Sequence, residues 1–200
     1  MSPTEEHLAY PEAAEAFWVG QAELAAERVG DDALERMTPA VAHLSDLFTT
    51  ERPDQKFPDY FADARLLAAY GVFFLPQSFT RTSFALAQAC GLRGWRPTSA
   101  SPSILDLGCG PGSCGVAAAH RFRQLGLGTP QLTGVDRSPS ALAAMESFGR
   151  AVLGAETTVR TRIGDASRPE TWPEGRYDLI VAGFVLNEMP SLDSAALLRW

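Results

Sequence analysis

The sequence predicts an α/β protein in which a helical N-terminal region precedes a parallel β-sheet. Residues 1–96 show apolar residues at helical spacing and no clear strand pattern. Residues 97–102 are rich in proline and serine and read as a linker. From residue 103 to residue 200, short apolar runs alternate with amphipathic stretches, which is typical of parallel strands joined by right-handed crossover helices.

The composition is that of an ordinary globular chain. The 200 residues are 46% apolar and 20% charged, which is enough for one core and an accessory subdomain. The longest apolar run, residues 66–75, falls short of the roughly 20 residues that span a bilayer. Residues 1–10 resemble neither a secretory signal nor a transit peptide, so we expect a cytoplasmic protein without a membrane partner.

Charge and cysteine content argue against two further classes of protein. The net charge of −7 disfavours nucleic-acid binding through bulk positive charge, although a local basic patch remains compatible with it. Cys90, Cys109 and Cys114 are odd in number and lack paired spacing. They therefore predict neither a disulfide framework nor a metal site.

The N-terminal region predicts a series of helices. In the first, Phe17, Leu24, Ala25 and Val29 share one face before Gly30. The next apolar series follows the i, i+3, i+7 rhythm and consists of Leu34, Met37, Val41, Leu44 and Phe48.

Proline and glycine residues predict where these helices end. Because Pro39 interrupts the second apolar series, with Thr38 as a cap, we expect two short helices there. A third helix follows the polar loop at residues 49–58 and should end before Pro76. The fourth, residues 78–90, should end at Gly91 in a left-handed cap.

The second half predicts four strands and two helices. The strands are expected at residues 104–107, 131–135, 157–163 and 177–183. Helices are expected at residues 113–125 and from Pro139 to Gly154, the latter capped by Ser138.

The centre of this pattern is the glycine-rich stretch at residues 104–115. Its glycines permit backbone angles closed to other residues and leave no Cβ between the turn and a ligand. The following helix directs its N-terminal N–H groups at the turn, which favours a carboxylate or phosphate. Gly110, Gly112 and Gly115 also satisfy the G-x-G-x-x-G spacing of dinucleotide-binding proteins, so a nicotinamide cofactor is one alternative.

Asp106 favours a different cofactor over a nicotinamide. The stretch from Asp106 to Gly112 reads Asp-Leu-Gly-Cys-Gly-Pro-Gly and resembles the D/E-x-G-x-G-x-G signature of class I S-adenosylmethionine-dependent methyltransferases. The resemblance covers roughly residues 103–190. It implies a Rossmann-like sheet with the strand order 3-2-1-4, a methyltransferase activity and S-adenosyl-L-methionine as cofactor. The cofactor-binding residues that it implies are Asp106, Gly108, Cys109, Gly110, Gly112, Asp136, Arg137, Asp165 and Ala166.

Two aspartates near strand ends add to this resemblance. Asp136 follows the second strand and could accept hydrogen bonds from the ribose hydroxyls, whereas Asp165 follows the third and could accept from the adenine amino group. Alternatively, Asp136 begins a turn and Asp165 caps a short helix.

A narrower resemblance comes from four segments: residues 70–81, 92–97, 135–139 and 185–188. Together they look like the methyltransferase-like proteins linked to the small ribosomal subunit, known from mitochondria and with bacterial relatives. The resemblance implies ribosomal RNA or the small subunit as partner, in the service of translation. The alternatives are a small-molecule methyltransferase and a non-catalytic cofactor-binding assembly protein.

The acceptor should lie near the end of the fourth strand. Asn187 could face the transferred methyl group or orient the acceptor, and Glu188 could act as a base. The alternative is that residues 187–190 only turn the chain into the next helix, residues 192–200.

The fourth strand also predicts an assembly property. The resembled family continues through three more strands, in the order 3-2-1-4-5-7-6, so the sheet here would lack its C-terminal strands. Residues 179–186 are continuously apolar and carry no charge or proline to protect an edge. We therefore expect self-association through the exposed fourth strand, or a need for a further C-terminal segment.

Overall fold

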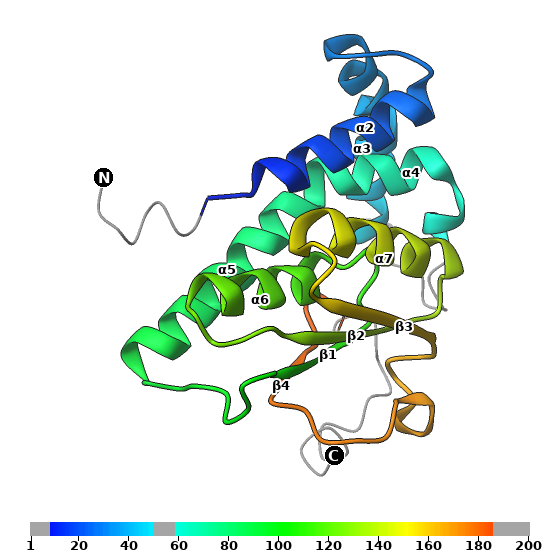
Figure 1. Cartoon of the computed structure of the whole chain (residues 1–200). Helices are drawn as coiled ribbons and strands as arrows, with labels where there is room; N and C mark the ends of the chain where they lie inside the picture. The colour runs from blue at the N-terminus through cyan, green and yellow to red at the C-terminus, as the bar shows by residue number, and fades with distance from the viewer. Residues whose placement is uncertain (1–8, 50–58, 186–200) are drawn as a thin grey trace.

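The computed structural model describes residues 9–49 and 59–185, which form a helical region stacked on an α/β sheet (Figure 1). The helical region contains α2 (Glu12–Ala26), α3 (Asp31–Thr49), the short helix η1 (Tyr60–Ala62), α4 (Ala64–Ala69), the π-helical turn η2 (Tyr70–Phe74) and α5 (Leu75–Leu92). The α/β part contains β1 (Ser103–Leu107), α6 (Ser113–Gln124), β2 (Gln131–Asp136), α7 (Pro139–Leu153), β3 (Thr158–Ile163), η3 (Pro169–Thr171) and β4 (Leu179–Val181).

The four strands form one parallel sheet in the order β3-β2-β1-β4. Register places Asp106 beside Gly134 of β2 and beside Val181 of β4. All four strands therefore end at the same edge of the sheet, where ligands bind in open parallel sheets. The predicted Rossmann-like order 3-2-1-4 and the helical N-terminal region are confirmed.

Alternation along β1 directs its side chains into two cores. Ile104 packs with residues of α6 and α7 on one face, whereas Leu105 and Leu107 pack on the other face with Val135 and Trp172. Asp106 shares the face of Ile104, because successive side chains of a strand point to opposite sides. This alternation buries a carboxylate beneath the helix-covered face of the sheet.

The helical region shares a hydrophobic core with the sheet and its helices. Trp18 of α2 is 1% exposed, and its ring lies 5.5 Å from that of Phe148 on α7. A side chain at Gly71 would collide with the indole of Trp18, so this glycine lets the π-helical turn approach α2 closely. The predicted regions 1–96 and 103–200 therefore contribute to one continuous core.

The prediction of two helices around Pro39 was wrong, because α3 runs unbroken from Asp31 to Thr49. Pro39 is exposed, so the carbonyl that it leaves without a helical donor faces water. Met37 and Leu44 are buried on the opposite side and stabilise the helix across the proline.

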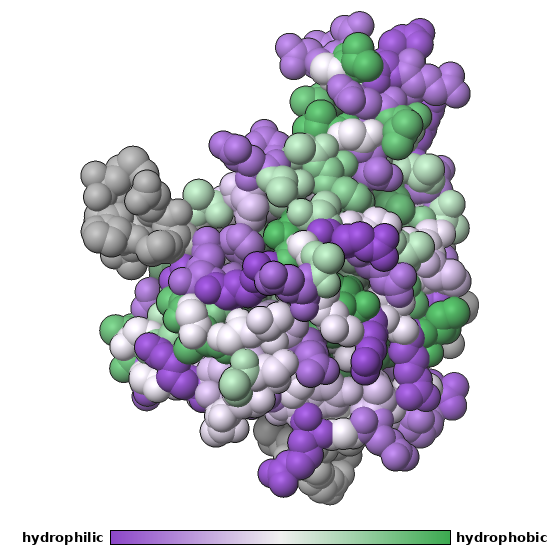
Figure 2. Space-filling view, viewed as in Figure 1, coloured by the Kyte–Doolittle hydropathy of each residue, from purple (hydrophilic) through white to green (hydrophobic). Residues whose placement is uncertain are grey.

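The predicted face of the first helix was also wrong. Leu24 and Val29 are 74% and 76% exposed, and the buried residues of α2 are Ala14, Trp18, Ala22 and Ala26. Small alanines let neighbouring helices approach α2, so packing favours this face over the one with larger apolar side chains. Figure 2 shows hydrophobic residues exposed among hydrophilic ones over the helical region at the top of the view.

The helix boundary predicted before Pro76 is not present either. Helix α4 continues through the π-helical turn directly into α5, and Pro76 follows that turn closely. The hydrogen-bond pattern of the helix changes at the π-helical turn, which accommodates the proline without ending the helix. Gly91 does not form a left-handed cap, because α5 extends to Leu92 and the glycine with positive φ is Gly94.

The boundaries of β1, β2, β3, α6 and α7 agree with the prediction to within about two residues, and Ser138 caps α7 as predicted. The first helix ends at Ala26, earlier than predicted, and α5 begins at Leu75, also earlier than predicted. The fourth strand is shorter than predicted, at Leu179–Val181. The helix predicted at residues 192–200 lies outside the described residues. In residues 9–49 and 59–185, no helix is both long enough and apolar enough to cross a bilayer.

Candidate functional site

The glycine turn follows β1 directly and adopts the backbone conformation that its sequence predicts. Gly108, Gly110 and Gly112 have φ values of +65°, +50° and +95°, a region that other residues rarely occupy. The backbone N–H groups of Gly108 and Cys109 donate to the carbonyl oxygen of Val135 at 2.8 and 3.0 Å. The turn is therefore fixed to the end of β2.

Asp106 lies beneath this turn. Its side chain is 1% exposed, and its Oδ2 accepts a hydrogen bond of 2.7 Å from the backbone N–H of Gly115 in the first turn of α6. Burial raises the pKa of the Asp106 carboxyl to about 7, with the Gly115 N–H opposing this shift and the charge of Asp136 adding to it. Asp106 thus fastens the start of α6 to β1.

Asp136 connects the glycine turn to the start of α7. Its Oδ2 accepts from the Gly110 N–H at 2.8 Å, and its Oδ1 accepts from the Ser138 N–H at 2.9 Å. Burial raises the pKa of Asp136, whereas the N–H groups of Ser138 and Gly110 and the charge of Arg137 lower it. The turn-forming role considered from the sequence is therefore present, and ribose binding by Asp136 stays a prediction. Arg137 is exposed beside it.

Asp165 organises the loop after β3. Its Oδ1 accepts from the backbone N–H and the hydroxyl of Ser167 at 2.9 and 2.6 Å. Ala166, the next residue, is buried, and its carbonyl accepts from the indole N–H of Trp172 at 3.2 Å. The Gly164 N–H donates to the carbonyl of Asp136, so this loop lies beside the end of β2. Asp165 therefore forms a local turn with Ser167 and does not cap a helix, because η3 follows Arg168 without a side-chain cap. Its contact with adenine stays a prediction.

The structure thus gathers the predicted cofactor residues at one edge of the sheet. The glycine turn, Asp136 and the Asp165 loop are linked by backbone hydrogen bonds, with Asp106 under the turn. Asn187 and Glu188, the predicted acceptor residues, lie outside the described residues.

Three side chains that the sequence did not single out lie against the turn. A Cβ at Gly108 would collide with Val185, which follows β4, and a Cβ at Gly112 would lie 2.7 Å from Cγ of Met145 on α7. A Cβ at Gly110 would lie 3.4 Å from the ring of Phe61. Phe61 has no periodic pattern around it, so only the aromatic pair that it forms with Tyr60 could have drawn attention to it.

The cysteines beside the turn are packing residues in this structure. Cys109 and Cys114 are buried free thiols, and a Cβ at Gly183 would collide with the sulfur of Cys114. Burial raises the pKa of the Cys109 thiol well above its usual range and that of Cys114 to about 11, so both stay protonated near neutral pH. Across the described ranges, no group of three or more acidic, His or Cys side chains could hold a metal ion.

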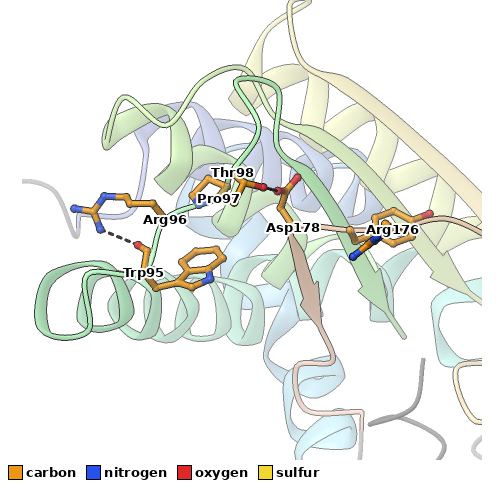
Figure 3. Close-up of a pocket in the computed structure, with 7 residues that line it drawn as sticks. Trp95, Arg96, Pro97, Thr98, Arg176 and Asp178 are labelled. Carbon is orange, nitrogen blue, oxygen red and sulfur yellow. Dashed lines mark hydrogen bonds between the residues drawn. The ribbon is translucent and has the colours of Figure 1, made fainter.

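A separate groove of about 340 Å³ lies at the amino ends of β1 and β4, far from the turn along the strands (Figure 3). Its lining residues are Trp95, Arg96, Pro97, Thr98, Arg176, Tyr177 and Asp178. The Asp178 carboxylate accepts from the Ser103 N–H at 2.8 Å, and the Arg96 guanidinium donates to the Trp95 carbonyl at 2.8 Å. Arg176 is exposed at the rim.

Comparison with known proteins gives one family match. Residues 105–199 match the model of a methyltransferase domain, which begins within β1 and includes the glycine turn. No curated protein sequence matches the chain. The match agrees with the methyltransferase domain predicted from the sequence. It does not support the narrower resemblance to proteins of the small ribosomal subunit.

Solved structures similar to this chain include three methyltransferases. Magnesium protoporphyrin IX methyltransferase from Synechocystis, with bound S-adenosylmethionine, is 18% identical over 80% of this chain and 68% of its own, with a TM-score of 0.43. A putative class I S-adenosylmethionine-dependent methyltransferase from Listeria monocytogenes is 13% identical over 84% of this chain and 50% of its own (TM-score 0.39). A plantazolicin methyltransferase in complex with S-adenosylhomocysteine is 18% identical over 84% of this chain and 45% of its own (TM-score 0.36). The chain thus spans half or less of the length of the last two.

Proposed function

From the methyltransferase domain matched at residues 105–199 and the geometry around it, we propose that this chain is an S-adenosylmethionine-dependent methyltransferase acting on a small molecule. The observation that carries the proposal is the junction between the glycine turn and Asp136. There the backbone nitrogen of Gly110, a glycine in the left-handed conformation, lies 2.8 Å from Oδ2 of Asp136, a partly buried carboxylate at the end of β2.

The residues present fit this cofactor chemically. Helix α6 begins at Ser113, directly after the turn, and the N-terminal end of a helix suits the carboxylate group of a ligand. Asp136 and Asp165 are acceptors, which suits the hydroxyl groups of a ribose and the amino group of an adenine. A partly buried carboxylate such as Asp136 gains from hydroxyl donors, because such donors offset the cost of its burial.

When bound, the cofactor supplies an electrophilic methyl group on a sulfonium, so transfer depends mainly on how the acceptor is positioned. The segment after β4 performs this positioning in the proposal. Val185 packs against Gly108, and Gly183 packs against Cys114 at the start of α6. The chain therefore leaves β4 beside the turn. In the proposal, Asn187 and Glu188, which follow in the sequence, orient the acceptor and act as a base.

Two observations favour a small-molecule acceptor. The net charge is −7, which disfavours a polyanionic substrate. The turn is also bordered by apolar side chains, including Phe61 and Met145, as small-molecule sites commonly are.

One observation favours the second candidate, an acceptor in small-subunit ribosomal RNA. The groove at the amino ends of β1 and β4 combines Arg96 and Arg176 with Trp95 and Tyr177, a combination that suits phosphates and stacked bases. It lies at the opposite end of the strands from the glycine turn, so it would hold RNA away from the methyl group.

Methyl transfer from tritiated S-adenosylmethionine tests both candidates. The full chain is incubated with a cell extract separated into small molecules and ribosomal RNA, and label is counted in each fraction. Label in small-molecule products that have been separated from unreacted S-adenosylmethionine supports the proposal, and label in RNA alone replaces it with the second candidate. Cofactor binding without label in either fraction would instead support a non-catalytic cofactor-binding protein.

A further inference from the structure

We propose that Phe61, from the helical region, forms one wall of the cofactor site over its adenosine half, next to Asp136. This inference rests on the proposed function and adds a binding residue that lies more than 40 residues before the methyltransferase domain match at residue 105. Phe61 belongs to η1, a single turn of helix between α3 and α4.

The position of the ring follows from the space at Gly110. A Cβ at this glycine would lie 3.4 Å from Cε2 and 3.5 Å from Cζ of Phe61, so the ring covers the side of the turn that the glycine leaves open. The N–H of the same glycine donates to Oδ2 of Asp136 at 2.8 Å. The ring and the carboxylate therefore contact the same residue of the turn.

An aromatic cluster fixes the orientation of this ring. The Phe61 ring lies 4.3 Å from that of Tyr60 and 5.1 Å from that of Tyr70, centroid to centroid. Tyr70 in turn packs against Phe48 and Phe74. Because Phe61 is only 6% exposed although both Asp59 and Ala62 beside it are exposed, the ring is directed inward and is held there.

Packing of η1 on α7 places the wall on the ribose side of the turn. Helix α7 begins at Pro139, immediately after Asp136 and its hydrogen-bond partner Ser138, and η1 contacts this helix. With the cofactor bound, an apolar ring there would limit the access of water to the carboxylate, which is partly exposed in the free chain. Hydrogen bonds from ribose hydroxyls to Asp136 would then form in a medium of lower dielectric constant, where they are stronger.

The alternative is that Phe61 only stabilises the aromatic cluster. Phe48 provides a matched control, because its ring packs against Tyr60 and Tyr70 as that of Phe61 does. No glycine of the turn has Phe48 among its nearest neighbours. Replacing either phenylalanine by leucine loosens the same cluster, but only one replacement removes the ring from Gly110.

The test is calorimetric titration of the full chain with S-adenosylhomocysteine and, separately, with adenosine. We expect Phe61→Leu to raise Kd for both ligands roughly three- to tenfold, the usual effect of losing one aromatic contact. Phe48→Leu should leave both Kd values within about twofold of those of the parent, while it lowers Tm by about as much as Phe61→Leu does. If Phe61→Leu does not fold, Phe61→Tyr serves instead. It keeps the ring and adds a hydroxyl at Cζ, the atom that would lie 3.5 Å from a Cβ at Gly110, so it should weaken binding by crowding the turn.

The outcomes separate this inference from the function on which it rests. Unchanged binding by Phe61→Leu, or equal losses in Phe61→Leu and Phe48→Leu, would overturn the role of Phe61 alone. A loss for S-adenosylhomocysteine with none for adenosine would contradict its placement over the adenosine half. If the parent chain binds neither S-adenosylhomocysteine nor adenosine, the result contradicts the proposed function and, with it, this inference.

Discussion

Replacing Asp136 by alanine should weaken binding of S-adenosylhomocysteine strongly. In the proposed site its carboxylate accepts hydrogen bonds from ribose hydroxyls, and bonds to a charged acceptor contribute about 1.5–3 kcal/mol in total. The corresponding rise in Kd is roughly ten- to hundredfold.

The same substitution also affects the free energy of unfolding. Asp136→Ala leaves the N–H groups of Gly110 and Ser138 without their acceptor, which costs about 1–3 kcal/mol. Part of that cost is offset, because the burial that raises the pKa of Asp136 no longer penalises a carboxylate. The fold should therefore survive, and urea denaturation of the unliganded variant checks this.

Two further variants separate binding from folding. Asp136→Asn keeps one of the two acceptor oxygens and loses the charge, so it should fold with a loss of stability no larger than that of Asp136→Ala and still bind several-fold more weakly. Ser138→Ala removes the cap hydroxyl that accepts from Ala141 at 3.3 Å, which costs about 1 kcal/mol of stability and should leave Kd unchanged. Calorimetric titration measures all three, and a parent-like Kd for both Asp136 variants would refute ribose binding by this residue.

Three other perturbations test the structure around the turn. Gly108→Ala should lower the free energy of unfolding by roughly 1–3 kcal/mol more than Gly126→Ala. Both glycines have φ near +65°, but only at Gly108 would the new Cβ collide with a side chain, that of Val185. Equal losses of stability in urea denaturation would contradict this. Because the folded-state pKa of Asp106 is raised to about 7, the stability that it contributes is present at low pH and is lost as the pH rises through about 7. The parent should therefore lose roughly 2–3 kcal/mol more than Asp106→Asn between pH 5 and pH 8, and parallel pH profiles from chemical denaturation would argue against a buried carboxyl. Within the described residues strand β4 pairs only with β1, so its other edge is open and we expect the chain to self-associate through it. Ile180→Lys should abolish this self-association, because Ile180 is an exposed residue of β4. A monomeric parent chain in light scattering would exclude self-association through β4.

Local sequence was sufficient to predict the sheet and its glycine turn. Apolar runs separated by polar turns define each strand, and the left-handed angles at Gly108 and Gly112 are ones that glycine adopts readily. The capping of α7 by Ser138 is equally local, since a serine before a proline fits the first turn of a helix. Such signals predicted an α/β parallel sheet, whereas the strand order 3-2-1-4 came from the resemblance to class I methyltransferases.

Long-range packing decided what the sequence did not predict. Pro39 looks like a helix boundary, but buried residues on the other side of α3 keep the helix continuous. The buried face of α2 depends on the fit of Trp18 against Gly71, two residues more than 50 positions apart. Phe61 and Gly110 are also far apart in the sequence, so no local pattern around either residue predicts that they lie close together.

Titration calorimetry of the full 200-residue chain with S-adenosylhomocysteine and with NAD tests the central claim most directly. The glycine spacing alone is compatible with either ligand, whereas the methyltransferase domain match and the Asp106 signature favour the first. We predict saturable binding of S-adenosylhomocysteine, accompanied at a hundredfold excess over Kd by about 2.7 kcal/mol of stabilisation in thermal melts, and no response to NAD. Binding and stabilisation by NAD, with none by S-adenosylhomocysteine, would contradict the account.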